Sequence, residues 1–158
     1  YALLLTMRRI PQLYYGTEIL MNGTKEVTDG NVRKDFPGGF PGDKANKFTR
    51  KGRTAAENAM FDWTARLLHW RKGNDVIVHG KQIQFIPWHG IYVVTRQYNG
   101  RTVMTVINGR NTSGKLEVKR YAEIIGNNTT AHDVCTGESV SLSADVPLKA
   151  RQTMVLEF

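Results

Sequence analysis

The clearest pattern along the chain is a change in hydrophobic period near Asn74. Before it, apolar positions recur at helical spacing, starting after Thr54 and stopping at Gly73. Thr54 and Glu57 form a capping box, in which each side chain accepts a hydrogen bond from the other residue's backbone N–H at a helix start. The sequence therefore predicts one long helix. Its apolar stripe and flanking positions comprise Met60, Phe61, Trp63, Thr64, Leu67, Leu68, Trp70 and Arg71.

Beyond Asn74 the apolar residues fall in short runs separated by Gly, Asn and Ser, which is typical of antiparallel strands. Asn99-Gly100 joins two of these runs as a two-residue hairpin, because this pair favours the left-handed conformations of such a turn. Strands at this spacing indicate a small all-β sandwich. The predicted strands are 83–85, 91–98, 101–108, 115–118, 133–135, 139–142 and 153–158.

The chain before Thr54 combines a helical run, a short predicted strand and a long polar loop. Tyr1 to Met7 is an apolar helical run with no capping residue before it, which predicts that the chain is the C-terminal piece of a larger protein. Pro11 marks the entry to a short predicted strand, Gln12 to Tyr15, which Gly16 ends. A long loop rich in Gly, Asn, Asp, Lys and Pro follows, and loops of this length are usually functional.

The stretch from Ile10 to Glu18 resembles the signature that ends the eighth barrel strand in the α-amylase superfamily of glycoside hydrolases. The resemblance implies an α+β fragment. Residues 1–74 would be the last strand, loop and helix of a (β/α)8 TIM barrel, and residues 75–158 an antiparallel Greek-key C-terminal β-sandwich. Arg9 stands where a glycine is usual. The matching positions are Pro11, Tyr14, Tyr15, Gly16 and Glu18.

Two later stretches, 33–39 and 42–46, are most similar to the cyclomaltodextrinase and neopullulanase subgroup. The subgroup implies an intact bacterial enzyme of starch degradation. It would be a retaining hydrolase that cleaves α-1,4-glucosidic bonds in cyclodextrins, pullulan or maltooligosaccharides. Retaining hydrolysis needs two carboxyl groups about 5–5.5 Å apart. The family's catalytic motifs are not found in this chain, so no catalytic residue is expected here, and the chain alone is expected to be inactive.

Asp29 and Arg33 are the candidate substrate-binding residues. They match, at the same spacing, an Asp and an Arg that family members use to bind glucose hydroxyls in the loop after strand eight. A carboxylate accepts hydrogen bonds from sugar hydroxyls, and a guanidinium donates them in a fixed fork. A salt bridge within the loop, or simple solvation, is the alternative. Tyr14 and Tyr15 are interpreted mainly as packing residues, and Glu18 as a support for the loop.

The sequence predicts no metal site. The single Cys135 excludes an internal disulfide and a cysteine-based zinc site. Asp29 and Asn31 offer two oxygen ligands, whereas calcium takes six or more. The resemblance implies that calcium, where family members hold it, is bound mostly upstream of this segment, so no cofactor is expected here. The histidines, which lack the spacing of zinc ligands, are His69, His79, His89 and His132.

The net charge of +8 raises a nucleic-acid hypothesis. The densest basic cluster has glycines around it and only Phe48 as an aromatic neighbour, which favours a solvated loop. No apolar run approaches the ~20 residues that a bilayer needs. The resemblance implies a periplasmic or cytoplasmic location and a homodimer, and an exposed helix stripe should also promote association. The basic cluster comprises Lys44, Lys47, Arg50, Lys51 and Arg53.

Two other hypotheses remain open. The chain could be a non-catalytic carbohydrate-binding module, with Trp70, Trp88 and Tyr92 as a sugar platform, which predicts affinity for maltooligosaccharides in this chain alone. Alternatively, the sandwich could have a purely structural role. In that case removal of residues 76–158 would destabilise the barrel without changing its specificity.

Overall fold

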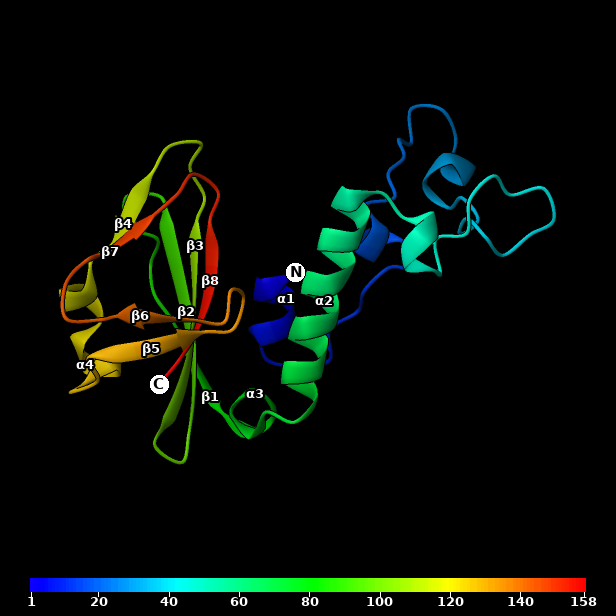
Figure 1. Cartoon of the computed structure of the whole chain (residues 1–158). Helices are drawn as coiled ribbons and strands as arrows, with labels where there is room; N and C mark the ends of the chain where they lie inside the picture. Colours follow the sequence, from blue (N-terminus) through cyan, green and yellow to red (C-terminus); the bar gives the residue numbers. More distant parts are fainter. The chain divides into compact units, whose positions relative to one another are not determined.

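The computed structural model describes residues 1–158, which form two compact units. One unit comprises residues 12–66, and the other combines residues 1–11 with residues 67–158. The long helix α2 (Ala55–Lys72) begins in the first unit and ends in the second (Figure 1). None of the helices is both long enough and apolar enough to cross a bilayer.

The second unit is built on a six-stranded sheet in the order β1-β2-β3-β8-β5-β6, in which every neighbouring pair is antiparallel. A separate pair of strands, β4 and β7, forms a second small sheet. The prediction of an antiparallel β domain is thereby confirmed. The strands are β1 (Lys81–Gln84), β2 (Ile91–Tyr98), β3 (Arg101–Asn108), β4 (Gly114–Leu116), β5 (Thr130–Asp133), β6 (Glu138–Ser141), β7 (Val146–Leu148) and β8 (Thr153–Glu157).

The large sheet turns sharply between β8 and β5. Only His132 and Asp133 of β5 pair with β8, and Figure 1 shows β5 and β6 running across the direction of β3 and β8. The apolar core is formed by residues of the large sheet, of the β4–β7 pair, and of a second layer of η4 (Val118–Tyr121) and α4 (Ala122–Ile125). Its members include Val93, Met104, Leu116, Tyr121, Ile124, Leu148 and Leu156.

The other face of the large sheet is also buried. Two short helices, α1 (Ala2–Thr6) and α3 (Asp75–His79), pack on this face over β2, β3 and β8. The sequence did not predict α3. Asn74 starts it, because its Oδ1 accepts hydrogen bonds from the N–H groups of Val76 and Ile77 at 3.0 and 3.4 Å. Burial on both faces explains why neighbouring residues of one strand, such as Val93 and Val94 of β2, are both apolar and buried.

The β2–β3 hairpin forms with the bounds that the sequence predicts. Asn99 and Gly100 both have positive φ, 49° and 75°, as a two-residue hairpin of this type requires. The predicted strand at 133–135 lies earlier, at β5, because Asp133 ends the ladder in a turn. β7 was not predicted. It contains Pro147, which a strand tolerates only at an edge, where this residue pairs with Lys115.

In the first unit, the predicted helix start is confirmed. The Thr54 N–H donates to Glu57 Oε2 at 2.7 Å and the Glu57 N–H donates to Thr54 Oγ1 at 3.3 Å. Leu67 of the apolar stripe is fully buried, so the expectation of a wholly exposed stripe is wrong at this position. Three short 3-10 helices precede α2, namely η1 (Thr17–Ile19), η2 (Asp29–Val32) and η3 (Arg50–Gly52).

The predicted strand at Gln12 to Tyr15 is wrong. A strand needs a partner for its backbone groups, and these residues pair with none in the structure. The Tyr14 carbonyl instead accepts hydrogen bonds from the N–H and hydroxyl of Thr17, at 3.4 and 2.9 Å. These bonds begin the turn that leads into η1.

Candidate functional site

Asp29 and Arg33 lie at the two ends of η2, a short helix in the loop of the first unit. Thr28 starts η2, because its hydroxyl accepts a hydrogen bond from the Asn31 N–H at 3.2 Å. The Arg33 N–H closes the helix by donating to the Gly30 carbonyl at 3.0 Å. A single short helix thus fixes the spacing of the carboxylate and the guanidinium.

Both side chains are exposed, and the ion pairs of the chain involve other residues. The loop salt bridge that was the alternative for Asp29 and Arg33 does not form in this structure. Their acceptor and donor groups therefore remain open to a ligand or to water.

Three hydrogen bonds hold the arms of the loop together beside η2. The Tyr15 hydroxyl donates to the Lys34 carbonyl at 2.8 Å, and Lys34 Nζ donates to the Asn22 carbonyl at 3.1 Å. On the other arm, the Thr24 N–H donates to Asn31 Oδ1 at 2.7 Å. The sequence alone did not identify these contacts, because each joins residues whose separation along the chain follows no motif.

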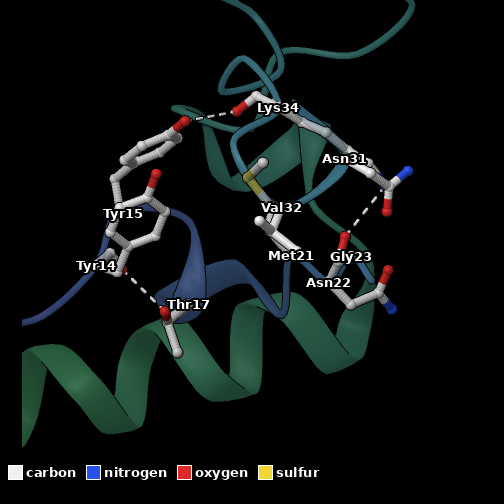
Figure 2. A pocket seen from close by; sticks show the side chains of 9 residues that line it. All are labelled: Tyr14, Tyr15, Thr17, Met21, Asn22, Gly23, Asn31, Val32 and Lys34. Atoms are coloured by element: carbon white, nitrogen blue, oxygen red, sulfur yellow. Dashed lines mark hydrogen bonds between the residues drawn. The ribbon is translucent and has the colours of Figure 1, made fainter. Parts of the chain in front are cut away.

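A pocket of about 280 Å³ opens between these arms. Figure 2 shows the rings of Tyr14 and Tyr15 on one side, with Met21 and Val32 at its centre and Asn22 and Asn31 on the far side. Its wall is thus aromatic and apolar, and its rim is polar. The lining residues are Tyr14, Tyr15, Thr17, Met21, Asn22, Gly23, Asn31, Val32 and Lys34.

The two tyrosines were interpreted as packing residues, but Tyr14 is 53% and Tyr15 44% exposed. Their rings contact each other with centroids 4.7 Å apart. A side-chain hydrogen bond with Tyr14, together with desolvation, raises the pKa of Tyr15 above its ordinary value. The charge of Asp35 adds to this rise and that of Arg33 opposes it. The Tyr15 hydroxyl therefore stays protonated at neutral pH and acts as a donor.

The other signature residues lead into this site. Gly16 has φ of 83°, and a β-carbon there would lie 2.3 Å from Met21 Sδ, so the turn requires glycine. Pro11 is half-buried just before the loop unit. Glu18 is half-buried in the first turn of η1.

Comparison with known proteins shows what the chain is similar to. Residues 82–157 match the model of the cyclo-malto-dextrinase C-terminal domain. An α-amylase of Niallia circulans is 26% identical over 148 residues, which cover 87% of this chain and 24% of that protein. A cyclomaltodextrin glucanotransferase of Geobacillus stearothermophilus is 24% identical over 151 residues, covering 90% of this chain and 19% of that protein.

The fold agrees with these sequence matches. An α-amylase structure from Anoxybacillus superposes on 98% of this chain and 30% of that one, with a TM-score of 0.71 and 18% identity. The chain spans about a quarter or less of the length of the two sequence relatives. The sequence matches and the shared fold agree with the resemblance to the α-amylase family that the sequence analysis identified.

The sugar platform considered for the β domain is already occupied by protein groups. Trp88 is 43% exposed, but its ring stacks on His89 at 4.5 Å, and the Arg120 guanidinium lies 4.7 Å from its centroid. The Tyr92 hydroxyl bonds to Gln84 Oε1 at 3.2 Å. The third member, Trp70, is half-buried on α2.

Two of the five residues of the basic cluster pair with carboxylates. Lys47 pairs with Glu57 at 2.6 Å and Arg50 with Asp62 at 2.8 Å. The Arg53 guanidinium lies 3.7 Å from the centroid of the Phe61 ring. Lys44 and Lys51 remain exposed. The pairing of Lys47 and Arg50 with acids thus reduces the charge that the cluster could offer to a phosphate backbone.

The residues considered as metal ligands have other surroundings. No three His, Cys, Asp or Glu side chains come together as a group that could hold an ion. Asn31 Oδ1, one of the two oxygens considered for calcium, accepts the Thr24 N–H. Cys135 is buried.

Proposed function

We propose that this chain works as the C-terminal part of a retaining glycoside hydrolase that cleaves α-1,4-glucosidic bonds in cyclodextrins, pullulan or maltooligosaccharides. The matching family model is named for a cyclomaltodextrinase, and the two sequence relatives are an α-amylase and a cyclomaltodextrin glucanotransferase. These names support the class of enzyme, and the similarity of residues 33–39 and 42–46 to the cyclomaltodextrinase and neopullulanase subgroup supports its substrates.

The observation that carries the proposal is the placement of Asp29 and Arg33 on one short helix with neither group in an ion pair. A ring with several hydroxyls needs acceptors and donors at a fixed separation, and a carboxylate and a planar guanidinium provide both. In this proposal the two residues grip glucose units of the substrate on the non-reducing side of the cleaved bond. They take no part in bond breaking.

The chemistry itself would come from elsewhere in the longer protein. A retaining mechanism uses a nucleophilic carboxylate and an acid about 5–5.5 Å apart. In this proposal residues 1–74 complete a (β/α)8 barrel whose upstream strands provide those groups, and residues 75–158 form the C-terminal sandwich. Any calcium would be bound upstream. The location would be the periplasm or cytoplasm of a bacterium, and the intact enzyme would form a homodimer.

The test is the release of reducing sugar from β-cyclodextrin, pullulan and soluble starch by the intact protein. We expect hydrolysis, with a preference for cyclodextrin or pullulan over starch, and no hydrolysis by the 158-residue chain alone. Hydrolysis with a preference for starch would support the family but not the subgroup. If the intact protein cleaves none of the three glucans, the enzyme proposal fails. Affinity of the isolated chain for maltooligosaccharides would then favour a binding module.

A further inference from the structure

The loop that carries Asp29 and Arg33 is closed at its base by a tyrosine far from η2 in sequence. Tyr15 donates its hydroxyl to the Lys34 carbonyl at 2.8 Å, across 19 residues. Lys34 follows Arg33 directly, so this bond restrains the backbone beside the guanidinium. Figure 2 shows the Tyr15 ring reaching over the pocket to this carbonyl.

Only part of the loop depends on that bond. On the other arm, a β-carbon on Gly23 would lie 2.1 Å from the Asn31 carbonyl oxygen, so the backbone there packs directly on η2. In addition, the Thr24 N–H donates to Asn31 Oδ1, and the Asn31 N–H donates to Thr28 Oγ1. The Asp29 end is therefore held by several contacts.

The Arg33 end has fewer supports. Beyond the closure of η2 on Gly30, the bonds that reach it are those of Lys34, through its carbonyl to Tyr15 and through its ammonium to the Asn22 carbonyl. The ammonium is the end of a flexible, exposed side chain, and holding it in one geometry costs rotamer entropy. The aromatic ring of Tyr15 is rigid and contacts Tyr14. Tyr15 is thus the more effective restraint at this end.

We propose that the Tyr15 hydroxyl is a positioning group for Arg33, which it holds through the Lys34 carbonyl in the orientation that binds substrate. This inference rests on the proposed function of Arg33. Removal of the hydroxyl leaves the ring, the pocket wall and Arg33 itself in place, but frees the backbone that carries the guanidinium.

The decisive variant is Tyr15→Phe in the intact protein, assayed by maltooligosaccharide hydrolysis. The loss of one hydrogen bond should raise KM about two- to tenfold, with kcat unchanged. Tyr92→Phe is the matched control, because it removes a tyrosine hydroxyl with one exposed side-chain partner on the β domain. It should leave KM unchanged.

A double-mutant cycle separates positioning from general stability. If Tyr15 acts through Arg33, the rise in KM caused by Tyr15→Phe should vanish in an Arg33→Ala background. In the Tyr15→Phe variant, the Arg33 amide, which bonds to the Gly30 carbonyl, should also exchange its hydrogen faster than in the native protein.

The outcomes are distinct. The inference is overturned if Arg33→Ala raises KM but Tyr15→Phe does not, or if the two effects add in full. If Arg33→Ala leaves KM unchanged, the proposed role of Arg33 fails first, and the inference about Tyr15 fails with it.

Discussion

The Arg96 guanidinium donates two hydrogen bonds to the carbonyl oxygen of Gly80, from Nε at 3.0 Å and from Nη2 at 2.8 Å. A third bond runs from Nη1 to the Thr6 carbonyl at 3.3 Å. Gly80 follows α3 and Thr6 ends α1, so one side chain on β2 ties both helix ends to the sheet. Helix-terminal carbonyls are suitable partners for a cation, because they have no intrahelical donor.

Arg96 is 3% exposed and has no acidic partner among these contacts. Burial, with the positive charges of Arg71 and Arg8, lowers its pKa. Arg71 also restrains the segment around Thr6, because its guanidinium donates hydrogen bonds to the carbonyls of Leu5 and Arg9. The β domain thereby holds both chain segments that border residues 12–66, the segment that carries the candidate site.

The first prediction concerns Arg96→Ala. The substitution leaves the buried carbonyls of Gly80 and Thr6 without their donor, and each such group costs about 1–3 kcal/mol. For the two groups together we expect a loss of about 2–6 kcal/mol in the free energy of unfolding, measured in urea by circular dichroism. Arg96→Lys should recover little, because an ammonium lacks the planar fork.

Arg101→Ala provides the matched control on the neighbouring strand. Arg101 is exposed, and its contact to Glu157 is 3.6 Å long, so its removal should change stability by less than about 1 kcal/mol. Equal effects of the two alanine variants would show that Arg96 has no special role.

The sequence could predict those parts of the fold that local chemistry decides. The Thr54–Glu57 capping box and the Asn99-Gly100 hairpin were located because their hydrogen bonds and dihedral angles depend on neighbouring residues. Local patterns of this kind are reliable even when the distant contacts are unknown. In the loop, Asp29 and Arg33 were identified differently, by their match in type and spacing to an Asp and an Arg of the family that the sequence resembles.

The contacts that escaped prediction are those between distant residues. The burial of Arg96 was not predicted, because its acceptors come from residues 16 and 90 positions away. The hydrogen bond from Tyr15 to the Lys34 carbonyl was not predicted for the same reason, because the two residues are 19 positions apart. The strand predicted at Gln12 to Tyr15 does not form. Its local sequence favours a strand, but the structure offers no partner strand with which it could pair.

The second prediction concerns the pH dependence of the loop at Asp43. Backbone hydrogen bonds from Gly38 and Phe40, at 2.6 and 3.1 Å, lower the pKa of Asp43 below its ordinary value of 3.8. Because the folded state lowers this pKa, the stabilisation is complete above pH 3.8 and is lost as the pH falls through the folded-state value. Asp43→Asn should therefore weaken the loop at pH 7 and make little difference near pH 2.

Carbon NMR of the carboxyl group gives the pKa of Asp43 directly, and amide exchange at Gly38 reports on the loop. The exposed Asp35 provides the control, since Asp35→Asn should leave the exchange at Gly38 unchanged at either pH. A normal pKa for Asp43 would contradict the role assigned to these backbone bonds.

The third prediction compares three glycine-to-alanine variants. Gly100 has φ of 75° and open space around its missing β-carbon, so Gly100→Ala should cost only the strain of a left-handed residue, about 1–2 kcal/mol. Gly16→Ala adds a clash with Met21 to the same strain and should cost more. Gly73→Ala meets neither obstacle and should be neutral or slightly stabilising. Urea unfolding ranks the three variants by their loss in the free energy of unfolding. A different ranking would contradict the need for glycine at Gly16 and Gly100.

The last prediction concerns substrate binding by Asp29 and Arg33. In the intact protein, Asp29→Ala and Arg33→Ala should each raise KM for maltooligosaccharides about tenfold, because each removes charge-assisted hydrogen bonds to sugar hydroxyls. The value of kcat should stay near that of the native protein, since neither side chain takes part in bond breaking. Lys25→Ala and Glu26→Ala remove the same two charges from exposed positions of the same loop and should leave KM unchanged. If all four variants behave alike, the loop contributes only its overall charge, and the spacing fixed by η2 has no part in binding.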